Sequence, residues 1–105
     1  MSGYTVIAGT LVRFYTATPF TNIAGTVTDP TEVKFGYTVN GGSATTYTYG
    51  VGAQVVRDST GTYHIDIDTT GLSGTWTYAW VGYGTVQTRA EGQLIVSPQT
   101  VAVTA

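Results

Sequence analysis

The chain has 105 residues, a formal net charge of −2 and only 10% charged residues, with one histidine and no cysteine. This length fits a single domain around one core. Four basic residues are too few to neutralise a run of phosphates, so we expect no nucleic-acid binding. The lack of cysteine excludes disulfides, thiolate nucleophiles and zinc–thiolate sites.

The composition predicts an all-β protein. Threonine, valine, tyrosine and glycine are abundant, good helix formers are scarce, and no apolar pattern has a helical period. No apolar run is long enough to span a membrane, and the start of the sequence lacks the basic and apolar regions of a secretory signal.

The first strand is expected over residues 10–17, with Val12 and Phe14 facing the core.

The clearest alternation predicts a strand over residues 33–39. Its core-facing side chains are Val33, Phe35, Tyr37 and Val39. Asp29 and Pro30 indicate a turn before it, and Asn40-Gly41-Gly42 indicates a hairpin turn after it, because these residues tolerate positive φ. Residues 43–49 should return as a half-exposed hairpin partner.

Two further strands are expected over residues 54–57 and 62–68, joined by a turn in which the Asp58 carboxylate accepts backbone N–H groups. In the second strand three residues point inward: Tyr63, Ile65 and Ile67. Three others point outward: His64, Asp66 and Asp68. Two of these outward side chains could share a cation, but we strongly favour a plain polar outer face on a sheet whose inner face is apolar.

The heaviest aromatic face belongs to a strand over residues 75–81, where Trp76, Tyr78 and Trp80 alternate. These rings form either an exposed sugar-binding platform or the inner face of a central strand. We favour the core, with Trp80 partly exposed because it lies near the strand end. A last strand is expected over 86–96, with a bulge at Gly92.

About seven short strands separated by regular turn signals predict an immunoglobulin-like Greek-key β-sandwich over residues 10–96, with a small closed barrel as the alternative. Residues 1–9 and 97–105 lie outside this pattern as N-terminal and C-terminal arms, and Val101-Ala102-Val103 is typical of a small strand. The arms either take part in an assembly or fold back on their own domain.

No combination of residues indicates catalysis. The single histidine, His64, has no Gly-x-Ser-x-Gly elbow to accompany it, and no glycine-rich loop precedes a helix. We therefore expect no enzyme activity, no cofactor and no metal site.

Four stretches carry a resemblance to a known group. They are DPTEVKF at residues 29–35, YTYG at 47–50, VVRDSTGTYHID at 55–66 and GTWTYAW at 74–80. Over residues 10–96 the sequence resembles the short immunoglobulin-like structural proteins of tailed bacteriophages and prophages, although it lacks the cysteine pair of antibody-type domains. The resemblance implies a virion component on the head, neck or tail, with no catalytic residues.

The expected function is that of a non-enzymatic virion structural protein, an immunoglobulin-like decoration or accessory protein on the capsid. It would be made in the host cytoplasm and assembled into the virion. The alternatives are a head–tail connector, a tail assembly or decoration protein, and a carbohydrate-binding adhesin module that uses Tyr47, Tyr49, Trp80 and Tyr83. The expected partners are capsid, neck or tail proteins, further copies of the chain, and surface glycans. The candidate interface residues are Tyr4, Val6, Tyr47, Tyr49, Tyr83, Val101 and Val103.

Overall fold

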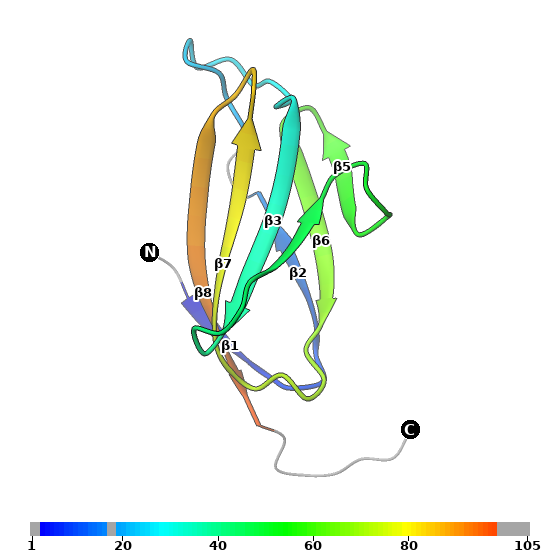
Figure 1. Ribbon diagram of the computed structural model, residues 1–105, viewed down its shortest axis with the longest axis vertical. Helices are drawn as coiled ribbons and strands as arrows, with labels where there is room; N and C mark the ends of the chain where they lie inside the picture. The colour runs from blue at the N-terminus through cyan, green and yellow to red at the C-terminus, as the bar shows by residue number, and fades with distance from the viewer. Residues whose placement is uncertain (1–2, 17–18, 99–105) are drawn as a thin grey trace.

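A computed structural model describes residues 3–16 and 19–98 of the chain as two β-sheets packed face to face (Figure 1). The strands are β1 (Gly3–Ile7), β2 (Leu11–Tyr15), β3 (Glu32–Val39), β4 (Thr45–Thr48), β5 (Val55–Ser59), β6 (Thr62–Asp68), β7 (Gly74–Tyr83) and β8 (Thr88–Ser97). One sheet has the order β1-β8-β7-β3-β4 and the other has the order β2-β6-β5. The predicted immunoglobulin-like β-sandwich is therefore confirmed.

Strand β1 is the one element that the sequence did not indicate. It lies within the stretch expected to form an N-terminal arm, and it pairs in parallel with β8 from Gly3 opposite Gln93 to Ile7 opposite Ser97. All other pairings are antiparallel. Residues 3–7 thus fold back on their own domain, one of the two alternatives for the arms.

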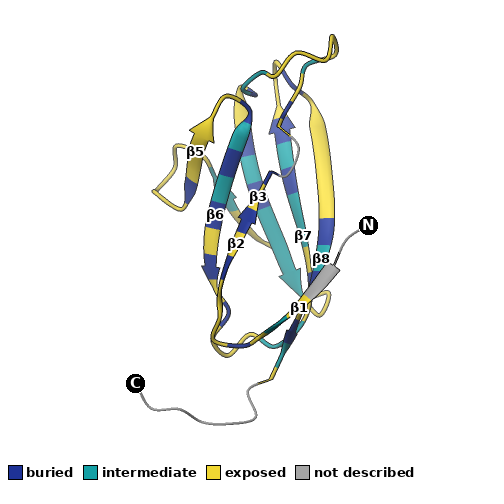
Figure 2. Cartoon of the chain, turned by 180° about the vertical axis from the view of Figure 1, so that it is seen from behind, coloured by how far each residue is buried: buried dark blue, intermediate teal, exposed yellow. Residues whose placement is uncertain are grey.

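The core is built from the alternating residues that the sequence predicted. Val12 and Phe14 of β2 and Tyr63, Ile65 and Ile67 of β6 are all buried between the sheets (Figure 2). From the other sheet the buried side chains are Val33, Phe35, Trp76, Trp80, Leu94 and Val96. Because strand side chains alternate, these two apolar faces can be brought together only in a sandwich.

Trp80 is buried, not partly exposed as its position near the expected strand end had indicated. Only 3% of its surface is exposed. The reason is the length of β7, which continues to Tyr83, so Trp80 lies within the strand and its ring packs against Phe35 with centroids 4.9 Å apart.

The bulge predicted at Gly92 is also wrong. The pairing of β7 with β8 runs without a register shift, and Gly92 lies opposite Tyr78. A Cβ atom at residue 92 would lie 2.6 Å from the Tyr78 hydroxyl oxygen. The glycine therefore makes room for the tyrosine ring and does not mark an extra residue in the strand.

The two tryptophans should respond differently to replacement by phenylalanine. The Trp76 indole N–H donates to the Leu72 carbonyl at 2.8 Å, whereas the Trp80 indole N–H is buried with no partner among the described residues. Both changes leave a cavity, but only Trp76→Phe also leaves a carbonyl without its donor. In urea unfolding we expect Trp76→Phe to lose about 1–2 kcal/mol more stability than Trp80→Phe. Equal losses would contradict this assignment.

Candidate interaction surfaces

The polar face of β6 is occupied by contacts within the chain. The His64 Nδ1 atom lies 2.8 Å from each Asp58 carboxylate oxygen. Asp66 accepts two hydrogen bonds from Arg13 on β2, at 2.8 and 3.0 Å, and Asp68 accepts hydrogen bonds from Thr70. In the part of the chain that the structure describes, no group of three or more His, Asp or Glu side chains is placed to hold a metal ion.

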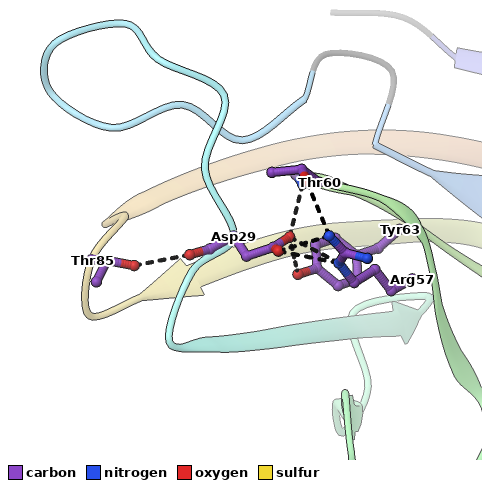
Figure 3. A network of polar contacts seen from close by, with 6 residues as sticks. Asp29, Arg57, Thr60, Tyr63 and Thr85 are labelled. Atoms are coloured by element: carbon purple, nitrogen blue, oxygen red, sulfur yellow. Dashed lines mark hydrogen bonds and ion pairs between the residues drawn. The ribbon is translucent and has the colours of Figure 1, made fainter.

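Asp29 is the centre of a cluster of polar contacts that joins three parts of the chain (Figure 3). Its carboxylate accepts hydrogen bonds from the Arg57 guanidinium, from the Gly61 backbone N–H at 2.8 Å and from the Tyr63 hydroxyl at 2.9 Å. Its backbone carbonyl accepts from the Thr85 hydroxyl at 2.9 Å. The cluster ties the segment before β3 to the β5–β6 turn and to the β7–β8 turn.

The prediction that the Asp58 carboxylate accepts the backbone N–H groups of the β5–β6 turn is therefore wrong. Asp29, which lies 32 residues from Gly61 in the chain, accepts the Gly61 N–H. The hydrogen bond from Arg57, with those from Gly61 and Tyr63, lowers the pKa of Asp29 to about 2. Burial, with the adjacent Asp29 carboxylate, raises the pKa of Tyr63 to about 12. The Asp29 carboxylate is therefore ionised near neutral pH, and its hydrogen bonds join the segment before β3 to the β5–β6 turn.

The candidate interface residues that the structure describes differ in exposure. Val6 and Tyr47 are half-buried and pack against the core, whereas Tyr49 and Tyr83 are exposed. The Tyr49 ring meets the buried Tyr63 ring edge-on, with centroids 5.4 Å apart. With Trp80 buried, the four rings considered for sugar binding form no common platform. The side chain of Tyr4, and Val101 and Val103, lie outside the described residues.

Ile23 is a protruding apolar residue that was not predicted from the sequence. It lies at the tip of a small hairpin closed by a bridge between Thr21 and Val27, and its side chain is fully exposed. The Asn22 side-chain oxygen accepts the backbone N–H groups of Ala24 and Thr26, each at 3.0 Å. Such bonds hold the loop in one conformation. In the sequence, Asn22 followed three residues later by Gly25 indicates a turn, which places Ile23 near its tip.

A shallow hollow of about 400 Å³ lies on the five-stranded sheet. Small residues, Gly36 and Ala79 among them, line it on adjacent strands. Lys34 and Arg89, which also line it, form ion pairs with Glu32 and Glu91 respectively. The charges are balanced locally, so this face attracts neither anions nor cations strongly.

Comparison of the chain with protein-family models, with curated proteins and with solved structures gave no match in any of the three.

The described residues contain no helix long and apolar enough to cross a membrane.

Proposed function

We propose that this chain is a non-enzymatic structural protein of a tailed bacteriophage or prophage, an immunoglobulin-like decoration or accessory protein on the capsid. The observation that supports the proposal most is the exposure of large apolar side chains. Large apolar side chains are exposed at Ile23, Leu11, Tyr15 and Val51, on a chain with few charges. Preorganised apolar side chains are typical anchors of protein–protein interfaces.

Two further points support an assembly role. The polar side chains that could have served chemistry, above all Asp29, His64 and Asp66, are engaged in contacts that stabilise the fold. The resemblance to immunoglobulin-like phage proteins, over residues 10–96, includes strands β2 to β7 and nearly all of β8, but not β1. An attachment site on the neck or the tail is the second candidate. The dispersed aromatic rings give no support to a sugar platform.

The proposal can be tested on purified particles. Particles made with the gene present should contain the chain in many copies by quantitative mass spectrometry, and particles from a deletion strain should take up the purified protein. Detection of the chain only in the cell lysate, never in particles purified to constant composition, would contradict the proposal.

The Ile23 loop gives a matched pair of variants for the same assay. Ile23→Asp removes the protruding apolar side chain, whereas Ala24→Asp places the same charge one residue further along the loop, also exposed. We expect Ile23→Asp to weaken particle binding on the order of tenfold or more and Ala24→Asp to change it little. An equal effect of both changes would mean that Ile23 is not an anchor.

A further inference from the structure

The sandwich is open along the first half of β8. Ala90 lies directly opposite Trp80 in the β7–β8 ladder, so both side chains face the interior. Trp80 is buried, yet Ala90 is exposed, as are Thr88, Arg89 and Glu91 on either side of it (Figure 2). An inward-facing residue that stays exposed marks a place where nothing described covers the inner face.

The backbone of the same segment has an open edge. Strand β1 pairs with β8 only from Gln93 to Ser97. On the side away from β7, no described strand pairs with residues 88–92. Alternate residues of an antiparallel strand direct their N–H and C=O groups to that side, where they form a template for another strand.

A hollow of about 320 Å³ lies beside this edge. Its lining is mostly aromatic or small and includes Tyr15, Phe20, Tyr78, Trp80 and Ala90, together with Glu91. An open edge next to an apolar hollow has the two components of strand addition, in which backbone hydrogen bonds provide affinity and a pocket takes alternate side chains. The edge strands of the two sheets are β1, β2, β4 and β5. None of them pairs with β7, so none has an exposed inward-facing residue opposite a buried tryptophan.

We propose that this edge binds residues 99–105 of a second copy of the chain as an added strand. The sequence of that segment, QTVAVTA, has no charge and is rich in β-branched residues. Val101 and Val103 are two residues apart, so in an extended strand both point the same way, towards the aromatic hollow. The proposal deepens the proposed function, since it names the contact through which copies assemble.

A second copy can supply the whole segment, whereas the same copy can bring only part of it to the edge. From Ser97 back to the near end of the open edge at Gly92, β8 spans about 17 Å. Residues 98–105 span at most about 29 Å when fully extended. Within one copy they would have to reverse direction and pass outside β1 first, which leaves few of them to pair with residues 88–92. The donor segment follows one end of β8 and the acceptor edge lies at the other. The contact is therefore head-to-tail, and it produces rings or open chains of subunits.

The test uses two full-length variants that fail in different ways. Ala90→Glu places a charge in the hollow and leaves the donor segment intact. The double variant Val101→Asp, Val103→Asp spoils the donor segment and leaves the edge intact. Ala44→Glu is the control, because Ala44 is also exposed and lies just before β4 on the far edge of the same sheet. Circular dichroism establishes that each variant is folded.

Light scattering after size exclusion gives the outcome. We expect the wild-type chain and Ala44→Glu to exceed the mass of a dimer as concentration rises, each of the two designed variants to be monomeric, and their equimolar mixture to form dimers. A monomeric wild-type chain, unchanged association of either variant, or a mixture that stays monomeric would overturn the proposal. Particle uptake is measured separately, so a monomeric chain that still binds particles refutes the strand contact and leaves the proposed function standing.

Discussion

Replacing Gly61 by alanine is expected to lower the free energy of unfolding by about 3 kcal/mol, whereas the same change at Gly71 costs about 1 kcal/mol. Both glycines have a φ of +73°, so the strain of a left-handed alanine is the same at both sites. They differ in what the new methyl group meets. At residue 61 a Cβ atom lies 2.9 Å from the Phe20 carbonyl oxygen and 3.1 Å from the Phe20 nitrogen, and at residue 71 nothing lies within 4 Å.

This comparison tests the packing of the segment before β3 against the β5–β6 turn. The Phe20 N–H donates to the Gly61 carbonyl at 2.9 Å, so the two backbones cannot separate to admit a methyl group without losing a hydrogen bond. Urea unfolding of the two variants, with the slope checked for constancy, gives both values. Equal losses at residues 61 and 71 would show that this close approach does not exist in solution.

The second large effect is expected at Asp29. Replacement by asparagine removes the charge that Arg57 pairs with and leaves fewer acceptor sites for Gly61 and Tyr63, so we expect a loss of about 1–2 kcal/mol near neutral pH. Asp66→Asn is the control, because Asp66 also pairs with an arginine in the open but has no backbone or tyrosine donor. Its loss should be clearly smaller.

The pH dependence follows from the lowered pKa of Asp29. Because the folded-state pKa is about 2, below the ordinary value of 3.8, the carboxylate stabilises the fold fully above about pH 4. This contribution, about 1 kcal/mol after allowance for solvent screening, is lost as the pH falls from about 4 to about 2. Asp29→Asn should flatten that part of the stability curve. A variant that loses stability between pH 4 and pH 2 as steeply as the wild-type chain would contradict the assignment.

The parts of the fold that the sequence predicted are those determined by local alternation. In β6 the inward residues Tyr63, Ile65 and Ile67 could be identified because every second residue is apolar and the strand is bounded by turn residues. The Asn40-Gly41 turn was equally local, and both residues have positive φ as expected. Neighbours in the chain decide such features, so no knowledge of the tertiary structure is needed.

The errors concern contacts between distant residues. Gly92 was taken for a bulge because a single chain segment cannot show that Tyr78 lies opposite it. The turn at Gly61 was assigned to the adjacent Asp58, whereas Asp29 from the segment before β3 accepts its N–H. The parallel pairing of β1 with β8 joins the two ends of the domain, and no local pattern reports it.

The grouping of surface residues could not be predicted from the sequence, for a related reason. Exposed tyrosines could be proposed from alternation, but their grouping depends on the spatial arrangement of the strands. Tyr49 lies against the core residue Tyr63, whereas Tyr83 lines the hollow on the five-stranded sheet. The open half of β8 is apparent only in the structure, where there is a mismatch: Ala90 faces the interior but is nevertheless exposed. A mismatch of this kind exists only once both sheets are in place.

The most direct test of the account is to mix the purified chain with capsids and with tails that lack it and to measure uptake by co-sedimentation. The account predicts saturable uptake by capsids, with a fixed number of copies per particle and weaker uptake of Ile23→Asp. Uptake by tails alone would move the proposed site to the tail and contradict the capsid assignment. A chain that ignores both particles at saturating concentration would contradict the virion function itself.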